Sequence, residues 1–152
     1  MHHFKQWIGY HKAYTTWFHA AHHVSKGSGF AGDHVNLYGK IYTELEADFD
    51  PLVEKALGLT NEETLANPAN ILADAGMCLT QMPVPSMQCD LGIASNGLAL
   101  IKEYIKLLST LFKQFESEGS LTLCLDDFIC ALSNKYESFV YLLQQRVKQE
   151  VG

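Results

Sequence analysis

The sequence predicts an all-α protein, a four-helix bundle with a short helix in the long crossover between helices two and three. Three observations lead to this fold class. Apolar residues recur at every third or fourth position over four long segments, as on one face of a helix. No segment alternates as a strand does. The first and last pairs of segments have short connections, which favour antiparallel neighbours and hence a bundle.

The first two long helices are predicted in the N-terminal part of the chain. The first covers residues 4–25, without proline, and carries an apolar face of aromatic residues and histidines. The stretch "KGSG" then interrupts the pattern, as glycine-rich turns do. The second helix has the apolar register His34, Tyr38, Ile41, Leu45, Phe49, Leu52 and Ala56, and we expect it to close at Gly58.

The crossover and the last two helices follow. Residues 58–90 contain three of the four prolines, and "ANILADAGMCL" within them is typical of a short helix. The third long helix is expected over about residues 89–117, with "ESEGS" at its end. The fourth is expected over about 121–149, with Ser120 or Thr122 as its cap.

Composition limits the classes of function. A chain of 152 residues fits one domain, 1–152. The net charge of −6 disfavours non-specific binding to nucleic acid, which needs clustered Lys and Arg. Charged residues are only 18%, a hint of oligomer interfaces. There is no signal-peptide pattern and no apolar run long enough to span a membrane. Four cysteines without a CxxC pair suggest packed or free thiols in a reducing compartment, so we expect a cytoplasmic protein.

All seven histidines lie within the first 34 residues. His19 and His23 are one helical turn apart and could bind Zn²⁺ or Cu²⁺ if a third ligand arrives, for example with His22 in a zinc site. The alternative is that they are polar residues on the wet face of the first helix, close to lysines. His22 differs, because its register places it on the apolar face.

His22 and His34 are therefore two inward imidazoles that need partners, and a metal is one kind of partner. Asp50 and Glu54 follow at helical spacing on one face. Two histidines with an Asp and a Glu form an iron- or zinc-like ligand set. Other interpretations stay open: Asp50 before a proline is also a helix-start signature, and Glu54 could simply face solvent. No E-x-x-H pattern occurs, which disfavours a di-iron centre inside one bundle.

"HHVSKGSGFAGDH", residues 22–34, resembles the H-W-N-V-K-G-x-x-F-x-x-L-H segment of Dps, the ferritin-like mini-ferritins named as DNA-binding proteins from starved cells. His22, Lys26, Gly27, Phe30 and His34 match without a gap. "FDPLVEKALG" is similar to the family's D-x-x-x-E-R segment and places Asp50 and Glu54 on its two acidic positions. The resemblance in residues is confined to about 22–58, and the four-helix pattern extends it to the whole chain.

The resemblance implies a hollow homo-oligomer, a dodecamer, with ferroxidase sites between two-fold-related subunits. It makes His22 and His34 ligands on one subunit and Asp50 and Glu54 ligands on its partner. Fe²⁺ is then oxidised there, preferentially by hydrogen peroxide, and the ferric mineral is stored inside. With this net charge and no Lys/Arg-rich tail, DNA binding is not expected. The alternative function is a ferritin-like bundle without iron chemistry, acting as a structural or interaction protein.

The sequence departs from the Dps pattern at four points. Tyr38 stands where an acidic ligand is usual, and His23 stands where Trp is usual. His19, His23 and Tyr38 are therefore possible auxiliary ligands. The spacing from His34 to Asp50 is one residue longer, so the acidic pair aligns only with an insertion or a helical bulge. Pro51 lies inside the second helix, where it removes a backbone donor and is expected to kink the helix.

Overall fold

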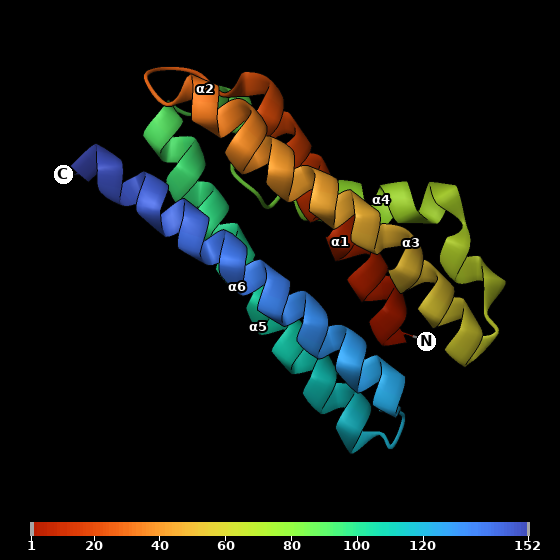
Figure 1. Cartoon of the computed structure of the whole chain (residues 1–152). Coiled ribbons are helices and arrows are strands. Elements are labelled where there is room, and N and C mark those ends of the chain that lie inside the picture. Colours follow the sequence, from red (N-terminus) through yellow and green to blue (C-terminus); the bar gives the residue numbers. More distant parts are fainter. Residues whose placement is uncertain (1, 152) are drawn as a thin grey trace. The chain divides into compact units, whose positions relative to one another are not determined.

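The computed structural model describes the backbone of residues 2–151 and the side chains of residues 2–148; its helices are shown in Figure 1. Helices α1 (His2–Val24), α2 (Phe30–Gly32), α3 (Lys40–Thr60), α4 (Pro68–Leu79), α5 (Asp90–Ser117) and α6 (Leu123–Val151) follow in order. A π-helix, η1 (Asp33–Gly39), joins α2 to α3 without a break, and two 3₁₀ turns, η2 (Glu63–Ala66) and η3 (Pro85–Met87), flank α4. No strand occurs in this part of the chain, so the all-α prediction is confirmed.

The chain divides into two compact units, one up to Ile93 and one from Ala94 onward. In the first unit α1 lies beside α3, and the two run antiparallel (Figure 1). His22, near the end of α1, lies next to Gly39, the last residue of η1 before α3, while His11 reaches Leu45 in α3. Trp7, Tyr14, Trp17 and Phe18 of α1 are buried, together with Ile41, Leu45 and Leu52 of α3, as the apolar registers predicted.

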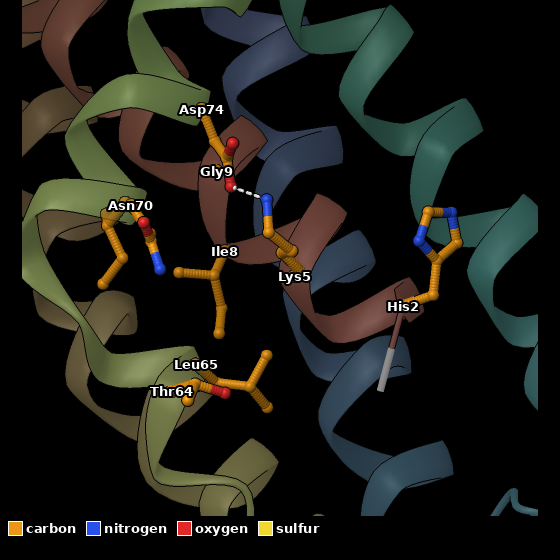
Figure 2. Close-up of a pocket in the computed structure, with 9 residues that line it drawn as sticks. His2, Lys5, Ile8, Gly9, Thr64, Leu65, Asn70 and Asp74 are labelled. Carbon is orange, nitrogen blue, oxygen red and sulfur yellow. Dashed lines mark hydrogen bonds and ion pairs between the residues drawn. The ribbon is translucent and has the colours of Figure 1, made fainter.

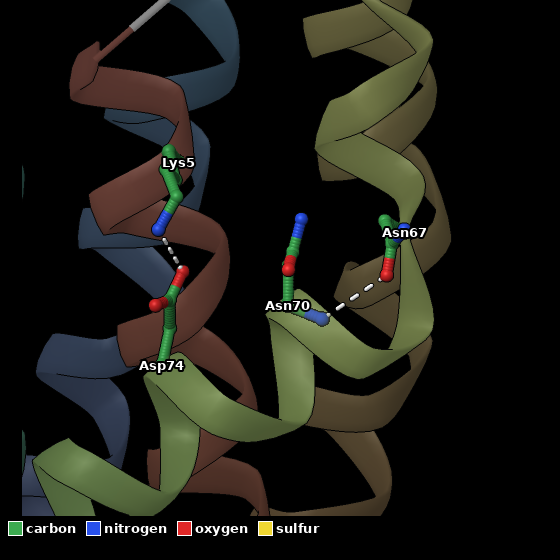
Figure 3. Close-up of polar contacts among 4 residues, drawn as sticks. All are labelled: Lys5, Asn67, Asn70 and Asp74. Carbon is green, nitrogen blue, oxygen red and sulfur yellow. Dashed lines mark hydrogen bonds and ion pairs between the residues drawn. The ribbon is translucent and has the colours of Figure 1, made fainter.

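The crossover helix α4 begins and packs as its sequence dictates. Asn67 caps it by accepting a hydrogen bond from the backbone N–H of Asn70 at 3.1 Å, and Pro68 occupies its first turn (Figure 3). It crosses α1 closely at Gly9, where a Cβ would lie 2.8 Å from the Cβ of Asp74. The indole N–H of Trp17 donates to the carbonyl of Pro83 at 2.7 Å, so the crossover is tied to α1 at a second point.

The second unit is an antiparallel pair, α5 with α6, in which Tyr104 packs on Tyr136 with ring centroids 5.1 Å apart. Helix α5 ends at a left-handed glycine, Gly119 (φ 70°), after which the N–H of Ser120 bonds the carbonyl of Phe115 at 2.9 Å. Thr122, one of the two expected caps, accepts from the N–H of Leu125 and starts α6.

One expectation about the second helix is wrong, and one interpretation that was left open does not hold. It does not close at Gly58: α3 continues to Thr60, and Asn61, in the left-handed conformation, bonds back to Leu57 and ends it. Asp50 with Pro51 is not a helix start either, because α3 runs through both residues. Pro51 is tolerated there on the exposed side of the helix. The cysteines are free thiols, as one of the two expected states, and Cys89, Cys124 and Cys130 are exposed.

Candidate metal centre

The centre of interest is the pair of imidazoles at the junction of α1 and η1. The rings of His22 and His34 stack with centroids 3.9 Å apart and an interplanar angle of 15°. They are half-buried, and their contacts are reciprocal. Nδ1 of His34 donates to the carbonyl of His22 at 2.7 Å, and Nδ1 of His22 donates to the carbonyl of His34. The pair is thus held by backbone on both sides.

These contacts determine which nitrogen of each ring can bind a metal. A carbonyl oxygen only accepts, so each Nδ1 carries the proton, and the neutral ring then has its lone pair on Nε2. Neither Nε2 has a hydrogen-bond partner among the described residues. A backbone carbonyl that fixes the tautomer of an imidazole is the usual support of a histidine ligand. The pair therefore presents two Nε2 donors.

Two neighbours of the pair could not be singled out from the sequence. Ser25 donates to the carbonyl of His22 at 2.9 Å, and its Oγ lies 3.3 Å from Nδ1 of His34. Tyr42 stacks on His19 with centroids 4.2 Å apart and lies 5.3 Å from the His22 ring. Serine is common at helix ends, and tyrosine is common on the apolar face of a helix. Neither residue therefore indicated a functional site in the sequence.

The possible auxiliary residues have different surroundings. His19 and His23 are exposed, with ring centroids 4.4 Å apart. Partial burial lowers the pKa of His19, as do the charges of His23 and His22, against the opposing effect of Glu46. Tyr38 is only 1% exposed and lies in the core of the first unit.

The acidic pair lies far from the imidazole pair within one chain. Asp50 and Glu54 are exposed neighbours on α3, and neither forms a hydrogen bond or ion pair with another described residue. Gly39, which touches the His22 ring, is about three helical turns from Asp50, or about 16 Å at a rise of about 1.5 Å per residue. Accordingly, residues 2–148 contain no group of three or more His, Cys, Asp or Glu that could hold a metal ion.

The π-helix bears directly on the spacing between the two pairs. It covers Asp33–Gly39, between His34 and Asp50, where the sequence has one residue more than the Dps pattern. A π-turn accommodates one extra residue in a helix without breaking it. A helical bulge, one of the two ways that the sequence allowed for the longer spacing, is therefore present between the two pairs.

A separate cavity of about 240 Å³ lies between α1 and the η2–α4 segment. Figure 2 shows Ile8 and Leu65 at its apolar side and Lys5 with Asp74 at its polar side. Nζ of Lys5 bonds Asp74 at 2.5 Å, so these charges neutralise each other, as Figure 3 also shows. His2 also lines this cavity.

Comparisons with known proteins bear on the fold. No protein-family model and no curated protein sequence matches the chain. Among solved structures, the X-ray structure of Dps from Thermosynechococcus elongatus matches with a TM-score of 0.75. The match covers 95% of this chain and 87% of that one, at 16% identity. The chain therefore has the fold of Dps, a ferritin-like four-helix bundle with a short helix in the crossover.

Proposed function

We propose that this protein oxidises Fe²⁺ and stores the ferric product, at sites that two copies of the chain build together. One copy supplies His22 and His34, and the other supplies Asp50 and Glu54. The observation that carries the proposal is the reciprocal hydrogen bonding of the imidazole pair, which leaves two Nε2 lone pairs without a partner among the described residues.

The donor set fits Fe²⁺ as the substrate. Imidazole nitrogen and carboxylate oxygen are suitable ligands for iron, and two carboxylates offset the charge that the metal brings. The proposed reaction takes one electron from each of two Fe²⁺ ions. Hydrogen peroxide accepts both electrons, takes up two protons and leaves as two water molecules. The net negative charge of the chain favours the approach of cations.

The partner in this proposal is a second copy of the chain in a closed homo-oligomer. The resemblance to Dps implies that this oligomer is a dodecamer. A two-fold axis relates the imidazole pair of each copy to the acidic pair of the other, so that every contact yields two sites. The low charged fraction and the exposed acidic pair support such an interface.

DNA is not a proposed partner. No helix among the described residues has the length and apolar character that crossing a bilayer requires.

Fe²⁺ titration of the purified protein, in air and with added hydrogen peroxide as the oxidant, tests this function through the ultraviolet absorbance of ferric species and the iron retained after desalting. The wild type is expected to oxidise Fe²⁺ well above the protein-free rate. H22A/H34A and D50N/E54Q should both lose this activity. The matched control is E103Q/E137Q, which, like D50N/E54Q, removes two negative charges, but from exposed positions on α5 and α6.

A wild type that neither produces the ferric absorbance nor retains iron would overturn the proposal. A large loss of thermal stability in H22A/H34A, with no metal effect in any variant, would instead favour the alternative function, a ferritin-like bundle that acts as a structural or interaction protein. Stoichiometric zinc in the purified protein would favour a zinc centre over an iron-oxidising one.

A further inference from the structure

Gly39, the last residue of the π-helix, lies against both members of the imidazole pair. A Cβ at this position would be 2.6 Å from the carbonyl oxygen of His34. It would also be 3.1 Å from Nδ1 and 3.3 Å from Cε1 of His22. The first of these distances is shorter than real Cβ contacts allow, and it involves backbone, which cannot simply rotate away. Any side chain here would therefore displace the carbonyl, the ring, or both.

The backbone of Gly39 does not require glycine. Its φ of −60° and ψ of −44° are ordinary helical values that every L-residue adopts. Glycine inside a helix costs about 1 kcal/mol relative to alanine. Because the backbone does not require glycine here, we explain the glycine by the absence of room for a side chain. The His22 ring occupies that room where it reaches the His34 carbonyl.

The π-turn determines which residue lies next to the His34 carbonyl. In an α-helix the residue four positions on lies below a given carbonyl, whereas in a π-helix the residue five positions on takes that place. His34 and Gly39 are five apart, and both lie in the π segment. The extra residue thus brings Gly39 under the His34 carbonyl, instead of Tyr38, which is buried in the core.

We infer that Gly39 is a positioning residue: together with the π-turn it leaves the His34 carbonyl open to Nδ1 of His22, and so fixes the tautomer and orientation of that imidazole. The importance of this for iron rests on the function proposed above. The position of the ring does not, and it can be tested without metal.

The experiment compares Gly39→Ala with Gly58→Ala in metal-free protein. Gly58 is the matched control because it lies in α3, the helix that continues from Gly39, and a Cβ added there would meet nothing within 4 Å. Helix propensity alone predicts that both substitutions raise the melting temperature. We expect G58A to raise it and G39A to lower it by several degrees. Long-range ¹H–¹⁵N spectra of the histidines should show His22 protonated on Nδ1 in the wild type and G58A, and should lose this signature in G39A.

Removal of the ring supplies the second variant. In a His22→Ala background the ring contacts disappear and only the contact with the His34 carbonyl is left. Adding Gly39→Ala should therefore lower the melting temperature less than it does with the ring present. If G39A does not fold, the H22A/G39A chain is expected to fold, and an H22A/G39A chain that also fails to fold would overturn the contribution of the ring. Equal stabilisation by G39A and G58A with an unchanged His22 tautomer would overturn the inference. The same loss of melting temperature from Gly39→Ala in the wild-type and His22→Ala backgrounds would also overturn it. Neither outcome depends on whether Fe²⁺ is oxidised.

Discussion

The proposal that two chains share each site leads to a specific prediction about mixed oligomers. One chain carries H22A/H34A and keeps the acidic pair; the other carries D50N/E54Q and keeps the imidazole pair. Each variant alone is expected to be inactive in Fe²⁺ oxidation. After the two are unfolded together and refolded, activity should return, because an intact imidazole pair can meet an intact acidic pair across the two-fold axis.

The size of the recovery follows from geometry. The imidazole and acidic pairs of one chain are separated by about 16 Å, while metal–ligand bonds are about 2 Å long, so one chain cannot complete the site alone. Random mixing puts the two variants together in about half of the two-fold pairs, and each mixed pair has one whole site of two. About a quarter of the wild-type rate per chain is therefore expected.

The assay is the initial rate of Fe²⁺ oxidation, with native mass spectrometry to establish that the mixed pairs have formed. The inactive variants mixed without refolding serve as the control and should stay inactive as long as subunits do not exchange. Mixed pairs with no recovered activity would refute the shared site. Full activity in either parent variant would refute the assignment of ligands.

Two further predictions concern stability. The pKa of His19 lies below its ordinary 6.5 in the folded chain, where His22, His23 and Glu46 surround it, so the unfolded chain binds more protons near that pH. This contribution to stability is complete above about pH 6.5 and is lost as pH falls through the folded pKa. Urea unfolding of His19→Gln should accordingly depend less steeply on pH than that of the wild type; an unchanged dependence would count against it. Gly119→Ala should destabilise the chain by about 1–2 kcal/mol, because a Cβ is costly at φ 70°. Thermal melts with Gly58→Ala as control test this, and a neutral effect would contradict it.

The helices could be predicted because each buries a stripe that its apolar spacing reveals. The predicted apolar faces of α1 and α3 are buried in the structure, for example at Trp7 in α1 and at Ile41 and Leu52 in α3. The end of α3 was misplaced because glycine marks a helix end only where the backbone turns left-handed, and here Asn61 does so instead of Gly58. Pro51 was compatible with both a helix start and a helix interior, and only the backbone distinguishes the two.

The sequence names the residues of the candidate site but does not give their arrangement. The spacing of His22 and His34 indicated two imidazoles near one another, and the structure stacks them. The reciprocal Nδ1 contacts could not be foreseen, because hydrophobic periodicity says nothing about which carbonyls are left open. The extra residue before Asp50 was visible, yet its place within the helix depends on local hydrogen bonding. Gly39 was not singled out, since glycine in a helical register gives no hint of a missing contact.

Trp17, which donates a hydrogen bond to the crossover, is an intrinsic fluorophore that reports on this contact without an added label. Both tryptophans of the sequence, Trp7 and Trp17, lie on α1 and are at most 2% exposed, whereas the unit from Ala94 onward contains only tyrosine and phenylalanine as fluorophores. Intrinsic tryptophan fluorescence therefore reports melting of the first unit, while far-ultraviolet circular dichroism follows every helix. A chain that unfolds as one cooperative domain gives coincident curves, and release of the crossover from α1 alters the environment of Trp17 first.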